Sequence, residues 1–324
     1  QEIEIYLRNA VEQKELLAKQ GIDEQPILNT QVVANMVGDY PFHEALELLP
    51  QPKGGDPDEL LRKKTIAGAK KRGTYGIEEY DKRRDEELDI IKSKGFAPYI
   101  IMVANTVAWA KSKGIQVGPG RGSAAGSLMC YELEITNVDP IEHNLLFFRF
   151  INPERNDWPD IDVDFEDRRR HEVKDYLRRQ YKHVASIATY GRWGGKKAVR
   201  DASRVFQVPL GEVNKALKGA DWMEPIDWWH EWERYDRSKE FRAKYPEVIK
   251  LAKFLHGRIR EQGMHAGGIV MSREPIAKFA PMQSNSDPND KAAPRIPVVA
   301  LDMDHVASIG LIKQDVLGLK ALSV

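Results

Sequence analysis

Residues 158–165, Trp-Pro-Asp-Ile-Asp-Val-Asp-Phe, constrain this chain more than any other stretch, because charged and apolar side chains alternate along them. In a strand, successive side chains point to opposite faces. One face would carry Asp160, Asp162 and Asp164, and the other would enter the core. Neighbouring carboxylates repel one another unless a cation lies between them, and such oxygen ligands suit Mg²⁺ or Mn²⁺. The pattern predicts a divalent-metal site or, as the simpler alternative, a strand with a solvated acidic face.

Composition narrows the class of protein. The 324 residues are enough for two domains and a sizeable core. Lysine plus arginine and aspartate plus glutamate both number 49, so a surface for a polyanion would have to be a local patch. The single cysteine, Cys130, cannot form an internal disulfide and is expected to be a small buried residue. No apolar run approaches the roughly 20 residues that span a bilayer, so we expect a soluble intracellular protein without a membrane partner.

Apolar spacing and capping residues indicate the secondary structure. Helices are expected over residues 2–19, 58–73, 78–94, 96–112, 168–181 and 250–260, with another that includes Val32 to Val37. Strands are expected over residues 115–117, 185–190 and 309–319, and residues 261–270 lead into a further strand. Asp58 is the expected N-cap of its helix. The helix over residues 96–112 is apolar nearly all round, which indicates a helix buried in a domain centre. The helix over residues 78–94 is charged, with a narrow buried stripe.

A glycine-rich segment follows the first expected strand. Residues 118–127 read Gly-Pro-Gly-Arg-Gly-Ser-Ala-Ala-Gly-Ser. A strand, a glycine-rich turn and small residues that open a helix together aim backbone amides at an anion. The spacing matches neither the Walker A motif nor the dinucleotide fingerprint, and tight packing of a helix on a strand also uses small residues. Arg121 inside the segment is a second candidate ligand for a phosphate.

The most basic stretch of the chain begins near Gly191. Its cations are Arg192, Lys196, Lys197, Arg200 and Arg204. They are the best candidates for contact with a duplex backbone, where contacts position DNA without reading its sequence; a solvated helix face is the alternative. The tryptophans that follow are Trp222, Trp228, Trp229 and Trp232. Their spacing favours the packing of a small helical module over base stacking.

Three isolated polar residues stand out in the sequence. Asp315 lies amid apolar neighbours in the last expected strand, and a buried acid of that kind requires a partner. Arg149 lies in an apolar run and requires an anion, which is a ligand or a nearby acid such as Glu154 or Asp157. His265 stands beside glycines, and a lone histidine is more often structural. The eight histidines show no spacing typical of a zinc site.

Five segments together resemble the C-family replicative DNA polymerases, the family of the alpha subunit of bacterial DNA polymerase III. The segments are residues 118–127, Asn-Pro-Glu-Arg at 152–155, Pro-Asp-Ile-Asp-Val-Asp-Phe at 159–165, His-Ala-Gly-Gly at 265–268 and Lys-Gln-Asp-Val-Leu-Gly-Leu at 313–319. They occur in that family's order and at about its spacing, from roughly Glu78 onward. Gln314 departs from the family, which usually has phenylalanine there, and residues 191–195 depart from its small-residue run.

The resemblance implies an α+β fold with a polymerase beta-like nucleotidyltransferase palm and an inserted helical thumb. The implied division is an N-terminal helical or linker segment (1–76), a first palm part (77–190), the thumb (191–270) and a second palm part (271–324). The implied catalytic and metal-binding residues are Asp160, Asp162 and Asp315, without Asp164. The implied nucleotide-binding residues are Gly122, Ser123, Arg149, Arg155 and Lys313. The implied DNA-binding residues are the five cations of the basic stretch.

The implied activity is that of a DNA-directed DNA polymerase, in which two Mg²⁺ ions, with Mn²⁺ as a substitute, support nucleotidyl transfer from a dNTP to a primer 3′-hydroxyl. Primer–template DNA would be a partner, with a sliding clamp and a proofreading exonuclease in the full-length family. The location would be cytoplasmic, at the nucleoid or replication fork. Because the family's PHP domain and fingers are not recognised, we expect a piece of a longer polymerase. The alternatives are a DNA-binding module without catalysis and a nucleotidyltransferase acting on a small substrate.

Overall fold

The computed structural model describes residues 9–38, 48–152, 154, 158–220, 228–286 and 295–323. The chain divides into two compact units, residues 1–43 and residues 44–324. None of the helices in the described ranges is long and apolar enough to cross a membrane.

The described residues of the first unit form a pair of helices, α1 (Ala10–Lys19) and α2 (Gln25–Met36). The Asn9 side chain caps α1 by accepting hydrogen bonds from two backbone amides of the first turn, and the Asn9 backbone N–H donates to the Glu12 carboxylate. Both expected helices are confirmed in the described part of the unit. Neither helix has a buried residue, and Met36 is 78% exposed.

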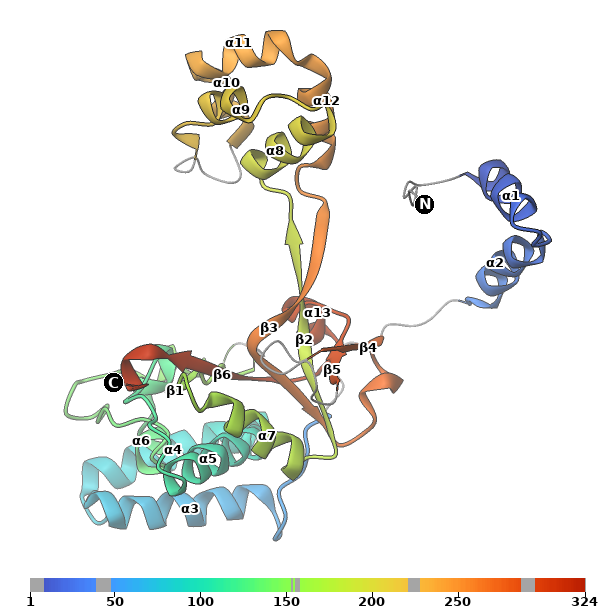
Figure 1. Ribbon diagram of the computed structural model, residues 1–324. Coiled ribbons are helices and arrows are strands. Elements are labelled where there is room, and N and C mark those ends of the chain that lie inside the picture. The colour runs from blue at the N-terminus through green and yellow to red at the C-terminus, as the bar shows by residue number, and fades with distance from the viewer. Residues whose placement is uncertain are drawn as a thin grey trace. The chain divides into compact units, whose positions relative to one another are not determined.

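The second unit begins with three long helices, α3 (Pro57–Arg72), α4 (Glu78–Lys94) and α5 (Ala97–Ser112), labelled in Figure 1. The expected N-cap was wrong by two residues: Asp56 accepts the Glu59 amide, because Pro57 takes the first helical position. The expected end at Gly73 is confirmed, with a left-handed φ of 78°. Most of α5 is buried, which confirms the predicted central helix. Each fully buried aliphatic side chain there contributes roughly 1.5–3 kcal/mol.

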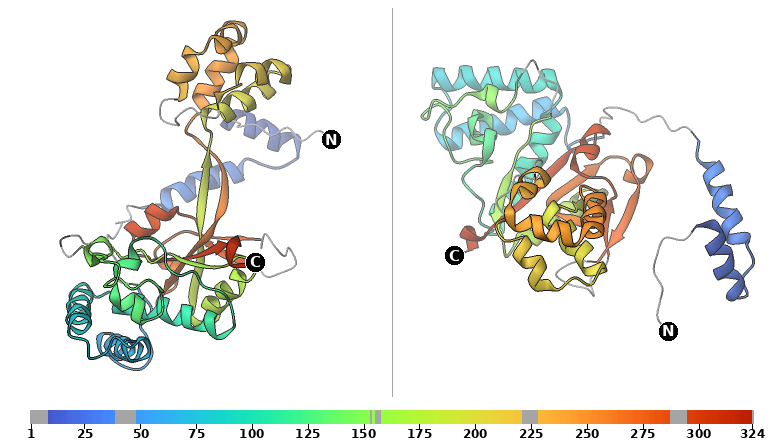
Figure 2. Two further views of the ribbon diagram at one scale, coloured as in Figure 1. Left: turned by 90° about the vertical axis from the view of Figure 1, so that its left-hand side faces the viewer. Right: turned by 90° about the horizontal axis from the view of Figure 1, so that it is seen from above.

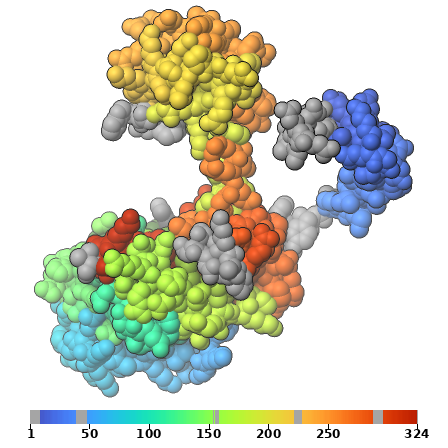
Figure 3. Space-filling view, viewed as in Figure 1, coloured from blue at the N-terminus to red at the C-terminus, as the bar shows by residue number. Residues whose placement is uncertain are grey.

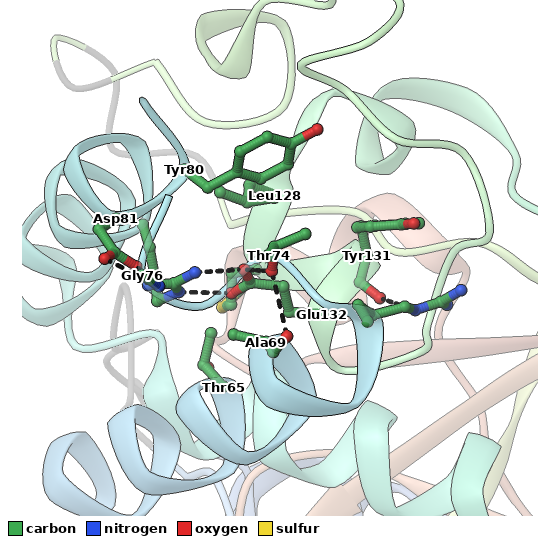
Figure 4. Close-up of polar contacts among 12 residues, drawn as sticks. Thr65, Ala69, Thr74, Gly76, Tyr80, Asp81, Leu128, Tyr131 and Glu132 are labelled. Atoms are coloured by element: carbon green, nitrogen blue, oxygen red, sulfur yellow. Dashed lines mark hydrogen bonds and ion pairs between the residues drawn. The ribbon is translucent and has the colours of Figure 1, made fainter. Parts of the chain in front are cut away.

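The buried stripe of α4 differs from the expected apolar one, because it contains ionic side chains. Arg84 and Glu87 are buried beside Leu88 and Ile91, and Tyr80 is half-buried. Arg84 Nη2 donates to Glu132 of the short helix α6 (Leu128–Glu132) at 2.6 Å, and the Thr74 hydroxyl donates to the same carboxylate at 2.7 Å. Figure 4 shows Thr74 and Glu132 facing each other in this network. The network fastens α4 to α6.

A six-stranded mixed sheet lies beside these helices. Its strands are β1 (Val163–Glu166), β2 (His183–Arg192), β3 (Ile259–Ser272), β4 (Met282–Asn285), β5 (Ile296–Val299) and β6 (Lys313–Leu319). The order is β1-β6-β3-β2-β5-β4, with parallel pairing of β1 with β6 and of β2 with β5 and antiparallel pairing elsewhere. This arrangement of helices and a mixed sheet confirms the predicted α+β class.

Three strand expectations need correction. The last strand was expected over residues 309–319 but begins at Lys313, because residues 309 and 310 form a turn. Residues 115–117 make only one bridge, between Val117 and Phe165. β1 begins at Val163, so Asp160 and Asp162 precede the strand, because pairing with β6 starts only at that residue. The alternation of burial still runs through the whole segment: Ile161, like Val163, is buried, and the aspartates are not.

The two faces of the sheet enter different cores. Ile269 and Met271 of β3 and Val316 of β6 pack in one core with α5 and with α7 (Arg170–Gln180). Val270 points the other way, into a second core with α13 (Met303–Ser308). Asp315 alternates with Val316, so its side chain lies on the face away from α5 and α7. The described part of this unit also contains the short 3₁₀ helices η1 (Gly122–Gly126), η2 (Phe147–Arg149), η4 (Ile276–Lys278) and η5 (Lys320–Ser323).

A helical cluster interrupts the sheet between β2 and β3. Its helices are α8 (Gly195–Val205), α9 (Leu210–Ala216), α10 (Trp228–Arg234), α11 (Asp236–Lys244) and α12 (Pro246–Leu255). They have a core of their own, and β2 and β3 stay paired as far as Arg192 and Ile259, where the cluster begins. The views in Figure 2 and the yellow-to-orange mass in Figure 3 show the cluster at the end of this two-stranded ribbon.

Buried side chains bear out two further expectations from the sequence. Trp228, Trp229 and Trp232 pack against one another with ring centroids 5.0–5.7 Å apart, which confirms a packing role. Trp222 lies outside the described residues. Cys130 is fully buried, as expected, and burial raises the pKa of its thiol to about 12.

Candidate active site

Three carboxylates from distant parts of the sequence meet beside the sheet. Asp160 and Asp162 lie in the segment that enters β1, and Asp315 lies on β6. Parallel pairing of the two strands, with Val163 opposite Val316, brings these segments side by side. One oxygen of each carboxylate lies within 4.8 Å of the other two. The structure thus brings together the three residues expected to bind metal, while their catalytic role stays a prediction.

The charges of this cluster are only partly compensated. Asp160 is exposed, Asp162 is half-buried and Asp315 is only 6% exposed. Burial raises the pKa of Asp162, and the negative charges of Asp160 and Asp315 raise it further. Asp315 Oδ1 is buried and has no hydrogen-bond partner among the described residues. Buried acceptors of this kind are rare in folded proteins, so the cluster lacks a ligand for that oxygen.

Lys313 supplies the partner that Asp315 was expected to need. Its Nζ lies 2.7 Å from Asp315 Oδ2 and 3.4 Å from Asp160 Oδ1. Burial alone would lower the pKa of Lys313, but the hydrogen bond and charge of Asp315, with the charge of Asp160, raise it overall. The resemblance implied a contact between Lys313 and a nucleotide, whereas in this structure the ammonium lies on the carboxylates and balances one of their three charges.

The glycine-rich segment packs directly against β1. The Gly118 amide donates to the Asp164 carbonyl at 2.8 Å, and a Cβ on Gly118 would lie 3.1 Å from Asp164 Cβ. Arg121 reaches Asp164 Oδ1 at 3.3 Å and Asp162 Oδ2 at 3.6 Å, with about half of its side chain (53%) exposed. Arg121 was considered as a phosphate ligand, and the structure pairs it with carboxylates. Asp164 therefore holds the glycine-rich segment through Arg121, and it is not one of the three aspartates that could hold a metal ion.

The other expected nucleotide contacts lie on neighbouring elements. Gly122 opens η1 with a φ of 64°, a left-handed conformation that favours glycine, and Ser123 follows it. Arg149 ends η2 and is exposed. Among the described residues, neither Ser123 nor Arg149 bonds to the three aspartates, and Arg149 does not pair with Glu154. Arg155 and Asp157 lie outside the described residues.

Two supports of the cluster were not foreseen as such. The Ile161 amide, between the first two aspartates, donates to the Tyr99 hydroxyl of α5 at 3.2 Å. Gly268 of β3 lies opposite Asp315, and a Cβ there would lie 3.3 Å from Asp315 Oδ1 and 2.8 Å from His265 Nδ1. His265 Nδ1 also accepts the Gly268 amide at 2.6 Å, in keeping with the structural role expected of it. The sequence offered only weak signals for these two supports: a tyrosine in an apolar helix and a histidine beside two glycines.

The five expected DNA contacts gather where the ribbon meets the helical cluster. Arg192 ends β2 and donates to the Gly257 carbonyl at 2.8 Å, and the other four lie on α8. Arg200 donates to Asn214 at 3.2 Å, and Lys197 is 3.5 Å from Glu261. Arg204 is 81% exposed, with Asp201 at 3.7 Å. The fold places four of the five cations on α8 and Arg192 at the end of the neighbouring strand β2, and their contact with DNA stays a prediction.

The residues of the cluster fit a divalent cation. All its ligand atoms are carboxylate oxygens, the donors that Mg²⁺ and Mn²⁺ prefer. The unpartnered Asp315 Oδ1 is an acceptor that a cation would satisfy, and Gly268 leaves the space beside it free of a side chain. Burial and then repulsion by Asp160 and Asp315 raise the pKa of Asp162, and a bound cation would relieve that repulsion.

Comparison with known proteins places this site in a family. Residues 59–318 match the family model described as the bacterial DNA polymerase III alpha NTPase domain. The chain belongs to the bacterial DNA polymerase III alpha family. It is 36% identical over 341 residues to the DNA polymerase III subunit alpha of Mycobacterium tuberculosis, 38% over 284 residues to that of Bacillus subtilis and 42% over 252 residues to that of Campylobacter jejuni.

The matches to the polymerase III alpha relatives cover 98%, 86% and 76% of this chain and 28%, 25% and 21% of the relatives. The chain therefore spans about a quarter of the length of the curated relatives it matches. The region matched by the family model includes the three aspartates, the glycine-rich segment and the whole helical cluster. Membership in the polymerase III alpha family is thus shown for the part of the chain that carries the candidate site.

Proposed function

We propose that residues 44–324 contain the catalytic palm of a DNA polymerase, which transfers a nucleotidyl group from a dNTP to a primer 3′-hydroxyl. The observation that carries this proposal is the convergence of Asp160, Asp162 and Asp315, with one buried oxygen left without a protein partner. The type of reaction is inferred from the name of the relatives, DNA polymerase III subunit alpha. In this proposal the palm is of the polymerase beta-like type, and residues 191–270 are its thumb.

Each group of residues has a proposed task. The three aspartates would hold two Mg²⁺ ions, which supply charge neutralisation at the phosphates and a lower pKa for the attacking hydroxyl. The amides around Gly122 and the Ser123 hydroxyl, with Arg149 and Arg155, would grip the triphosphate, where fixed donors act best on developing charge.

Lys313 and the basic stretch complete the proposal. Lys313 Nζ lies 3.4 Å from Asp160, so it would move from Asp160 toward the phosphates of a nucleotide that binds there. The cations of Arg192 and α8 would bind the backbone of the primer–template duplex.

The deciding experiment is single-nucleotide extension of a labelled primer–template in Mg²⁺. The parent chain, Asp160→Ala and Asp162→Asn should be compared, with Asp304→Asn as a control, because Asp304 is an exposed acid of α13 outside the cluster. We expect extension by the parent and the control and its loss, by about 10³-fold or more, in the two cluster variants. Mn²⁺ binding measured by electron paramagnetic resonance, without DNA, gives a readout that does not depend on activity.

The outcomes separate the candidate functions. Full activity of either cluster variant would refute the metal assignment. Metal binding without extension, together with salt-sensitive DNA binding, would favour a DNA-binding module, which the exposed cations of α8 already suit. Extension or nucleotide transfer without affinity for duplex DNA would favour a nucleotidyltransferase with a small substrate.

A further inference from the structure

A second concave site lies on the opposite side of the sheet from the carboxylates. The cavity has a volume of about 550 Å³ and is lined by α3, α5, α7, residues 50–53 and the end of β3. α5 and α7 cover the sheet face into which Val316 points, whereas Asp315 points to the other face. The size is within the roughly 300–1,000 Å³ that is typical of small-molecule pockets. The nucleotide site proposed above does not include any of its walls.

Three helices each turn one stripe of side chains toward the cavity. α5 contributes Pro98, Ile101, Met102 and Asn105, which are spaced as neighbours on one face of a helix. Pro98, Ile101 and Met102 are buried, so the cavity has an apolar floor. α3 contributes Leu60 and Lys64, and α7 contributes Tyr176 and Gln180, again at helical spacing. Because the walls are regular helices packed on one core, the cavity is preformed.

The charge of the cavity has one sign. Among the described residues of its lining, four are basic, Lys53, Lys64, Lys182 and Arg273, and none is acidic. Lys64 Nζ donates to Asn105 Oδ1 at 3.1 Å, which holds a half-buried ammonium toward the cavity. Low-dielectric walls strengthen the field of such charges, so the ligand that fits is an anion.

Two tyrosines and two amides suit a planar, polar-edged group. Tyr176 stacks on Trp109 with ring centroids 4.4 Å apart, so its position is fixed. Tyr181 is half-buried, and burial raises the pKa of its hydroxyl to about 12, which keeps it protonated and able to donate. Asn105 and Gln180 offer both donors and acceptors. An aromatic surface beside amides accommodates the face and the edge of a nucleobase.

We propose that this cavity binds a nucleoside phosphate at a site separate from the carboxylate cluster, with the phosphates at the four cations and the base between the tyrosines and the apolar floor. The proposal does not depend on the polymerase activity. Ser272 and Arg273 of the cavity are four and five residues beyond Gly268, which borders Asp315, so β3 connects the two sites.

The test is isothermal titration calorimetry of dATP in EDTA, with the Asp160→Asn variant of the full chain as parent, so that neither metal nor an intact cluster contributes. We expect Lys64→Gln and Lys182→Gln each to weaken binding by about fivefold or more, because each removes a charge-assisted contact. Lys63→Gln is the matched control, since Lys63 is an exposed lysine of α3 outside the lining, and it should bind as the parent does. Lys182 is exposed, so its variant tests the proposal even if Lys64→Gln unfolds the chain.

The contribution of the base is tested separately. Tripolyphosphate should bind at least about tenfold more weakly than dATP, and Tyr181→Leu should remove that difference. Equal affinity for the two ligands would reduce the site to a basic patch and overturn the proposal. So would failure of dATP to bind at millimolar concentration, or equal weakening by Lys63→Gln and Lys182→Gln.

Discussion

Two groups of acids lie on this scaffold: Glu87 and Glu132, which fasten α4 to α6, and the three aspartates beside β1 and β6. Each group contains a buried carboxylate, but the partners of the two groups differ. All four oxygens of the two glutamates accept hydrogen bonds. Glu87 takes the Leu128 and Met129 amides, the Ser127 hydroxyl and Arg83 Nε, at 2.7–3.1 Å. Glu132 takes Thr74 and both nitrogens of an Arg84 fork, at 2.6–2.7 Å.

The aspartate cluster is built in the opposite way. Its three acids face one another, with Lys313 between two of them, and Asp315 Oδ1 has no partner among the described residues. A group that only fastens elements together needs every acceptor satisfied, because a buried unpaired one costs about 1–3 kcal/mol. A group that binds a cation needs free oxygens and tolerates repulsion until the cation arrives. The contrast separates a structural network from a binding site on the same scaffold.

The largest expected effect on stability tests the glutamate network. Arg84→Met should lower the free energy of unfolding by about 3–5 kcal/mol, because it leaves the buried Glu132 carboxylate without its charged partner. Arg62→Met is the matched control: its pair with Asp85 is 2.7 Å long but about half exposed, and its loss should cost less than about 1 kcal/mol. Urea unfolding followed by circular dichroism measures both. Similar costs for the two variants would contradict the distinction.

The next effect tests the aspartate cluster. Mg²⁺ at about 100 times its dissociation constant should stabilise the parent by about 2.7 kcal/mol, because it binds the folded chain alone. Asp162→Asn should abolish this gain and, without Mg²⁺, be at least as stable as the parent, since it removes a repelling charge. Thermal melts with and without Mg²⁺, with Asp304→Asn as control, measure both. An Asp162→Asn variant that Mg²⁺ stabilises as much as the parent would rule out this residue as a ligand.

A smaller effect on stability tests whether a buried polar group without a hydrogen-bond partner near the site always serves metal binding. Gln314 is fully buried opposite Ile269, on the sheet face that packs with α5 and α7, and neither side-chain polar atom has a partner in the described part of the chain. Because it points away from Asp315, we expect Gln314→Leu to stabilise the chain by about 1 kcal/mol without changing Mg²⁺ binding. Gln116→Leu, at an exposed position, should change stability by less than about 0.5 kcal/mol. Loss of Mg²⁺ binding in Gln314→Leu would link this residue to the site.

Local patterns predicted local structure well. The helix over residues 96–112 and the burial of Ile161, Val163 and Phe165 followed from periodicity, which needs no knowledge of distant residues. The start of β1 did not follow, because it depends on pairing with β6. The glutamate network was also invisible: Arg84 and Glu132 are 48 residues apart, and charges on a helix ordinarily face water.

The candidate site was predicted in two different ways. By themselves the alternating aspartates left two interpretations open, a metal site and a solvated acidic face. Asp315 joined them only through the family resemblance, because no spacing rule connects residues that lie so far apart in the sequence. The roles of Arg121 and Tyr99 could not be derived, because both depend on which backbone the folded sheet places beside them. The sequence alone therefore did not predict which distant segments pair in the folded chain.

The smallest expected effect on stability concerns Glu134, an acid that forms an ion pair at the surface. Unlike the glutamate network, this pair should contribute little to stability, and unlike the aspartate cluster, it joins a single acid to a cation. Lys71 Nζ lies 2.7 Å from Glu134, and this hydrogen bond lowers the pKa of the Glu134 carboxyl below its usual 4.5. A lowered pKa means that the pair stabilises the fold above about pH 4.5 and that this contribution is lost as the pH falls through the folded-state value. Lys71→Gln should therefore cost less than about 1 kcal/mol at pH 7 and nothing near pH 2. Urea unfolding across this pH range, with Lys63→Gln as control, measures the difference; a cost that persists at pH 2 would mean that Lys71 acts through packing, because an ion pair to a protonated carboxyl no longer exists.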